Sequence, residues 1–142
     1  MPSEELDEQD VELIDAPTEL LKAEYEPDRL VTSAAIRASS GEIYTGMGLR
    51  THIGGTGTHA EPVALGRAIS NGEREFEVSV AMTYADVPRE GEPRVVAACG
   101  ICRELIQTYS SDTDIIVLED GERVSKPMSE LLPNPAYPEK VA

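Results

Sequence analysis

Short runs of apolar and β-branched residues alternate along the chain with stretches of helical periodicity, and this pattern predicts interleaved strands and helices. Strands are expected at residues 30–38, 42–49, 77–85, 95–97 and 114–119. Helices are expected at residues 18–24, from the end of the Gly-rich segment 51–58 to Asn71–Gly72, and at residues 99–109. Together these elements predict an α/β domain with an antiparallel hairpin first and parallel strands behind it.

The N-terminal segment is rich in acidic residues. They occupy half of positions 1–12, which predicts a disordered tail over residues 1–12 and a single folded domain over residues 13–142. Pro17 is tolerated in the first turn of a helix, so the first helix is expected to begin near Thr18. A chain of 142 residues with 40% apolar side chains is long enough to bury one core.

The net charge of the chain is −15, from 27 acidic and 12 basic residues. Because carboxylates repel phosphate backbones, duplex nucleic acid is not expected as a partner. The acidic surface can dock a basic protein, or it can be a solvated surface suited to a salt-rich cytoplasm, where screening weakens self-repulsion. The sequence has no apolar run near the length of a membrane helix and no secretory signal at its start. We therefore expect a cytoplasmic protein with no membrane partner.

Four chemically active residues fall at two of the expected helix starts. His59 and Glu61 begin one helix, and Cys99 and Cys102 begin the next in a Cys-x-x-Cys spacing. A helix N-terminus favours negative charge, so it lowers the pKa of a thiol and favours the thiolate that binds metal. One imidazole and two thiolates suit Zn²⁺ and leave a fourth tetrahedral position open for water, as in catalytic zinc sites. Glu61 is close enough in sequence to exchange protons with that water without being a ligand.

The same residues also allow other interpretations. His59 can be an exposed residue at a helix start, and Glu61 an ordinary first-turn acid stabilised by the helix dipole. The two cysteines alone would suit a redox site, which needs no histidine. They would also suit a zinc-binding interaction module, which needs no Glu61. A disulfide between them is not expected in a cytoplasmic chain.

The combination of His59-Ala60-Glu61 with Cys99-Gly100-Ile101-Cys102 resembles the cytidine deaminase family, whose zinc signature is H-x-E followed by P-C-x-x-C. The resemblance covers roughly residues 25–137, and the paired glycines before the metal histidine are similar to the blasticidin-S deaminase branch. It implies a three-layer α/β/α sandwich around a mixed sheet of about five strands. It also implies a Zn²⁺ cofactor and hydrolysis of the exocyclic amine of a cytosine-type nucleoside or analogue. A homotetramer whose sites are completed by neighbouring subunits is implied as well.

The resemblance also implies a set of substrate-binding residues, namely Gly48, Arg50, Ala60, Ala97, Ala98 and Tyr137, with carbonyls near Ala97 and Ala98 receiving the amine. Nucleoside-specific members carry Asn and Glu where this chain has Gly48 and Arg50. A guanidinium only donates hydrogen bonds, so Arg50 would suit a substrate carboxylate or phosphate, unless it is simply a surface residue. Ala98 stands where the family has Pro. The alternatives are a catalytically silent zinc-binding module of the same fold, or a deaminase of a different amino-heterocycle.

Overall fold

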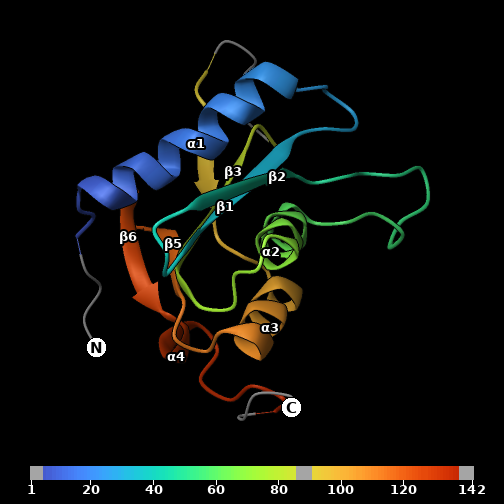
Figure 1. Ribbon diagram of the computed structural model, residues 1–142. Helices are drawn as coiled ribbons and strands as arrows, with labels where there is room; N and C mark the ends of the chain where they lie inside the picture. The colour runs from blue at the N-terminus through green and yellow to red at the C-terminus, as the bar shows by residue number, and fades with distance from the viewer. Residues whose placement is uncertain (1–4, 86–90, 138–142) are drawn as a thin grey trace.

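The computed structural model describes residues 5–85 and 91–137, in which one mixed sheet carries helices on both faces (Figure 1). Its strands are β1 (Thr32–Ala38), β2 (Ile43–Met47), β3 (Phe76–Thr83), β4 (Arg94–Val96), β5 (Asp114–Glu119) and β6 (Glu122–Pro127). The strand order is β2-β1-β3-β5-β6, and β4 pairs with β3. In the described chain only β3 and β5 run parallel, so the expectation of several parallel strands behind the hairpin was wrong.

The central strands are buried on both faces because a helical layer covers each side of the sheet. Helix α1 (Glu8–Glu24) covers one face, and α2 (Ala60–Ser70), α3 (Gly100–Tyr109) and the short α4 (Met128–Leu131) cover the other. Side chains alternate along β1 accordingly, since Ala34 and Ile36 join the core under α2 and α3 while Ala35 joins the core under α1. The predicted three-layer α/β/α architecture is confirmed.

Helix α1 begins ten residues earlier than its predicted start near Thr18, so residues 8–12 are helical rather than a tail. Asp7 is the N-cap, and its carboxylate accepts from the Asp10 backbone N–H at 2.9 Å while Asp10 returns a hydrogen bond to the Asp7 N–H. The acidic residues that predicted disorder therefore include Asp7 and Asp10, which cap this helix. Residues 1–4 of the predicted tail lie outside the described residues.

Pro17 lies inside α1 rather than at its first turn, contrary to the prediction. A proline there removes one backbone donor from the helix, a cost that a buried, well-packed helix can carry. Leu13, Ile14 and Leu21 are at most 1% exposed against the sheet, and the Pro17 carbonyl accepts from the Ser33 hydroxyl of β1 at 2.7 Å. Packing therefore holds a helix that local propensity alone would interrupt.

Strand β6 was not predicted, which is why the sheet has six strands instead of about five. It pairs antiparallel with β5 through a two-residue turn in which Asp120 and Gly121 have φ values of 53° and 82°. Two consecutive positive φ values are typical of a type I′ hairpin turn, for which Asp-Gly is a favoured sequence. Within the described residues, no helix is long and apolar enough to cross a membrane.

Candidate metal centre and active site

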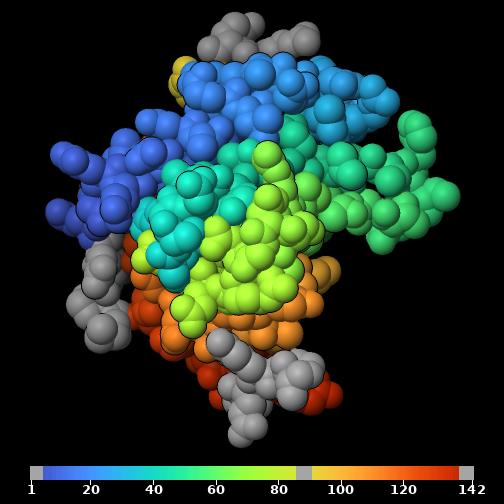
Figure 2. Space-filling view, in the orientation of Figure 1, coloured from blue at the N-terminus to red at the C-terminus, as the bar shows by residue number. Residues whose placement is uncertain are grey.

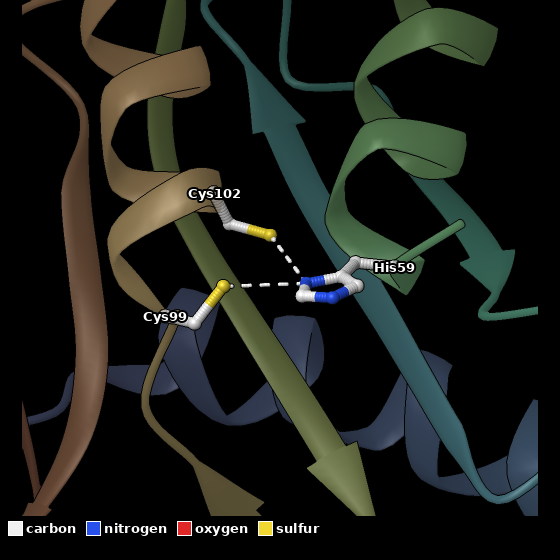
Figure 3. A group of neighbouring side chains, drawn as sticks. All are labelled: His59, Cys99 and Cys102. Atoms are coloured by element: carbon white, nitrogen blue, oxygen red, sulfur yellow. Dashed lines mark hydrogen bonds between the residues drawn. The ribbon is translucent and has the colours of Figure 1, made fainter. Parts of the chain in front are cut away.

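Two helix starts meet at one end of the sheet and supply the candidate ligands. His59 is the N-cap of α2 and Cys99 is the N-cap of α3, and neither side chain caps its own helix. Cys102 lies one turn into α3 and is fully buried. The three side chains point toward one another from the starts of α2 and α3 (Figure 3).

The predicted metal ligands are brought together. The Nδ1 atom of His59 lies 3.2 Å from the Sγ of Cys99 and 3.2 Å from the Sγ of Cys102. All three candidate donor atoms lie within 4.8 Å of one another. Ligands about 2.0–2.3 Å from a tetrahedral zinc are about 3.5 Å or slightly more apart, so the spacing is close to that of a zinc site.

The charge balance of this cluster also fits a cation. Burial raises the pKa of the Cys102 thiol, and the neighbouring Glu61 carboxylate and Cys99 raise it further. Desolvation is the largest of these causes, because a buried site disfavours the charged thiolate. A divalent cation would reverse this balance by stabilising the thiolate, and two sulfurs with one imidazole are a donor set that zinc prefers.

Glu61 lies in the first turn of α2, is 7% exposed and faces the cluster from the cavity side. Burial raises the pKa of its carboxyl group, while a hydrogen bond to its own backbone, the His59 charge and a hydrogen bond with Cys102 lower it. A carboxyl group whose pKa is moved upward toward neutrality is suited to both accept and return a proton.

The cluster opens into a cavity of about 910 Å³, within the range of small-molecule sites. Its walls include the Gly-rich segment 51–58, which stands out from the rest of the surface (Figure 2). The base of this segment is closed by paired backbone hydrogen bonds between Leu49 and Thr58, of 2.7 and 2.9 Å. A Cβ on Gly57 would lie 2.5 Å from the Leu49 carbonyl oxygen, so only glycine fits at position 57, where the two ends of the segment pass each other.

The cavity includes four of the six predicted substrate-binding residues, namely Gly48, Arg50, Ala60 and Ala97. Ala98 and Tyr137 do not line it. The Ala98 carbonyl accepts from the Arg103 Nε at 2.7 Å, so this carbonyl is already bonded. Tyr137 is 76% exposed in the single chain.

Arg29, Thr83 and Arg94 also line the cavity and were not predicted as site residues. Arg94 opens β4, where it pairs with Thr83 of β3. The signal was present in the sequence, because the strand that Arg94 opens leads directly into the Cys-x-x-Cys motif. It was missed because the predicted strand began at residue 95, one residue after Arg94.

Comparisons with known proteins agree with this geometry. No family model matches the chain. A blasticidin-S deaminase from Bacillus cereus is 36% identical over 130 residues, which cover 90% of this chain and 92% of the relative. The cytidine deaminase of Bacillus anthracis superposes with a TM-score of 0.75 at 23% identity, over 87% of this chain and 86% of that one. The cytidine deaminase of Mycobacterium tuberculosis gives a TM-score of 0.74 at 20% identity, over 92% and 99% of the two chains.

The structural likeness shows a shared fold, and the sequence identity to the Bacillus cereus protein over nearly the whole of both chains shows common descent. With the three candidate ligands together at two helix starts and Glu61 beside them, the chain belongs to the cytidine deaminase-like family of hydrolytic deaminases, in which the blasticidin-S deaminase of Bacillus cereus is its relative.

Proposed function

We propose that the chain is a zinc-dependent hydrolytic deaminase that removes the exocyclic amine of a cytosine-type nucleoside or analogue. The observation that carries this proposal is the convergence of His59, Cys99 and Cys102 on one point, with the buried Glu61 beside them in a cavity. The name of the 36% identical relative, blasticidin-S deaminase, supports a substrate of this class.

His59 Nδ1 and the two cysteine sulfurs would hold the metal. Bound zinc supplies Lewis-acid chemistry, which lowers the pKa of water and makes it a nucleophile at neutral pH. In the overall reaction, water adds its oxygen to the amine-bearing ring carbon, the C–N bond breaks, and ammonia leaves. Glu61 accepts a proton from the attacking water and returns it to the substrate, so that the amine departs as a neutral molecule.

The backbone near Ala97 is the candidate acceptor for the departing amine. Ala97 lines the cavity and is exposed, whereas the Ala98 carbonyl is held by Arg103. The position of Glu61 supports its role as a shuttle, because its buried carboxyl group lines the cavity beside the candidate metal ligands.

The proposal extends to assembly and location. Three large apolar side chains border the cavity and are exposed in the single chain, Leu49 at 52%, Ile53 at 69% and Ile101 at 71%. Apolar side chains around an open site are suited to cover by another subunit, which supports the homotetramer implied by the family resemblance. A contact from Tyr137 of a neighbouring subunit fits its exposure here. A cytoplasmic location stays a prediction.

A silent zinc-binding module is the second candidate, and Glu61 argues against it. Such a module has no use for a carboxyl group buried in a cavity beside the metal ligands, where desolvation is costly. A redox site would not need His59, whose ring nitrogen lies 3.2 Å from each of the two sulfurs.

Glu61→Gln tests the proposal most directly. The amide cannot move protons, so ammonia release from cytosine nucleosides should fall by about 10²–10⁴-fold, while zinc measured by elemental analysis should stay near one per chain. Glu12→Gln, an exposed acid on α1, serves as the matched control and should leave both quantities unchanged. Full activity of Glu61→Gln would refute the mechanism, and joint loss of zinc and activity would mean that Glu61 acts as a ligand.

A further inference from the structure

Arg103 follows the candidate ligand Cys102 on α3 and joins two parts of the chain that are far apart in sequence. Its Nε donates to the Ala98 carbonyl at 2.7 Å, and its Nη1 donates to the Leu131 carbonyl at 3.0 Å. The Arg103 side chain is half-buried and is not part of the cavity wall. It therefore has no direct contact with a substrate in the proposed mechanism, and its task must act through the groups that it holds.

Both carbonyls lie where a helix cannot supply a donor of its own. Leu131 is the last residue of α4, so its carbonyl is beyond the reach of the N–H groups of that helix. Ala98 precedes Cys99, the N-cap of α3, and the first helical hydrogen bond goes to the Cys99 carbonyl instead. Ala98 is 4% exposed, and a buried carbonyl without a donor is costly. Arg103 therefore supplies the donor that this carbonyl needs at the start of α3.

The hydrogen bond to Ala98 controls more than one carbonyl. The Ala98 carbonyl and the Cys99 N–H belong to one planar peptide unit, so a donor that fixes the carbonyl also fixes the plane. The peptide with the Ala97 carbonyl, the candidate acceptor for the departing amine, adjoins this plane at the Ala98 Cα atom. At the other end of the plane the Cys99 side chain points to His59, with 3.2 Å between Sγ and Nδ1 (Figure 3). A rotation of this one plane would move both groups.

Residue 98 offers little restraint by itself. The zinc-deaminase signature has proline before the first cysteine, and a proline ring would fix φ of residue 98 at about −65°. Ala98 has no such ring, so its backbone dihedrals are freer. The hydrogen bond from Arg103 to the Ala98 carbonyl restrains the same residue from outside.

We propose that Arg103 is a positioning residue of the active site, which holds the peptide between Ala98 and Cys99 so that the Ala97 carbonyl and the Cys99 sulfur keep their places. This inference rests on the proposed deaminase function. Two different nitrogens of the guanidinium reach two carbonyls, an arrangement that the single nitrogen of lysine cannot reproduce. The contact with Leu131 anchors the guanidinium at the end of α4, so the restraint on Ala98 has a fixed origin.

The test compares Arg103→Met and Arg103→Lys with the unaltered full chain after zinc loading, with the better of cytidine and blasticidin S as substrate. Arg103→Met should lower kcat by about tenfold or more while KM changes by less than about threefold, because Arg103 lies outside the cavity wall. Zinc release to an excess of a chromogenic chelator should become about tenfold faster, because Cys99 is less well held. Arg103→Lys keeps the charge but loses one of the two hydrogen bonds, so it should show the same changes to a smaller extent.

Two control variants separate positioning from general stabilisation. Exposed Arg74 also donates to two backbone carbonyls, those of Ile69 and Glu73, but it does not line the cavity. Arg74→Met should therefore leave kcat and zinc release unchanged. Glu104→Ala removes another tie between α3 and the chain end, the hydrogen bond of 3.1 Å from the Ala136 N–H to the Glu104 Oε1. It should leave zinc release unchanged, because Arg103 still holds the Ala98 carbonyl.

Unchanged kcat and unchanged zinc release in Arg103→Met would overturn the positioning role. Equally fast zinc release from Glu104→Ala would overturn it too, because the effect would then come from the chain end. If Arg103→Met does not fold, the same measurements on Arg103→Lys decide. If the unaltered chain holds zinc but releases no ammonia from either compound, the proposed function fails separately, and zinc release alone decides whether Arg103 holds Cys99. An unaltered chain that binds no zinc would overturn both proposals.

Discussion

Gly46 is a position where one methyl group should disturb the site from a distance. It lies on β2, opposite Ala34 of β1, and packs directly against α2. A Cβ built there would lie 2.7 Å from the Val63 Cγ1 atom and 2.8 Å from the Ala64 backbone nitrogen. The Val63 side chain can rotate, but the backbone of α2 can make room only if the helix moves.

The required movement sets the size of the effect. Ordinary van der Waals contact begins at 3.4 Å, so Gly46→Ala must push the Ala64 nitrogen away by about 0.6 Å. Overpacking of this kind costs about 1–3 kcal/mol, and we expect the melting temperature to fall by about 3–10 °C. Because His59 is the N-cap of α2 and Glu61 lies in its first turn, the same movement should lower kcat/KM by about tenfold or more.

Gly66→Ala is the matched control on the same helix. Gly66 is exposed, and a methyl group there would meet no atom within 4 Å. Alanine is the better helix former, so this variant should raise stability by about 0.5–1 kcal/mol without loss of activity. Thermal unfolding and ammonia release on both variants test the reasoning. If Gly46→Ala is as stable and as active as the unaltered chain, the close packing of β2 against α2 is not what positions the site.

Two further predictions concern the metal cluster and helix α1. Cys99→Ser should lower the zinc content well below one per chain and reduce the melting temperature, and a variant that keeps full zinc after dialysis would show that Cys99 is not a ligand. Asp10→Asn should destabilise the chain by about 1–3 kcal/mol in urea unfolding, because Arg37 loses a buried carboxylate partner. Glu8→Gln, exposed in the same helical turn, should change stability by only a few tenths of a kcal/mol, and equal effects of the two variants would contradict a role for the buried pair.

The convergence of His59, Cys99 and Cys102 could be predicted from sequence because these residues lie in two short motifs at helix starts. His59 and Cys99 are both N-caps, and an N-cap position depends mainly on local sequence. The sheet places the two helix starts next to each other. The substrate residues were harder, because their roles depend on contacts between distant segments. The Ala98 carbonyl illustrates this, since its partner Arg103 also donates to the Leu131 carbonyl at 3.0 Å and so ties three segments together.

The fold shows the same division between local and distant determinants. Strands with strong apolar patterns, such as β3, were located to within about two residues. The start of α1 was missed because its cap consists of acidic residues that also suggest disorder, and because its continuation through Pro17 depends on burial against the sheet. Strand β6 was missed because its own sequence is polar, and only the Asp120–Gly121 turn indicates that it returns to pair with β5.

The distance along the chain between the two halves of the metal cluster has a consequence for folding. His59 and Cys99 are 40 positions apart, and β3 and β4 lie between them. A metal held by both ends would close this stretch into a ring, much as a disulfide does, and loop-closure entropy would contribute about 4 kcal/mol to stability. Zinc would then act as a cross-link as well as a cofactor. Its loss should release the central strand β3 to exchange its amide hydrogens faster, even in a preparation that is never given substrate.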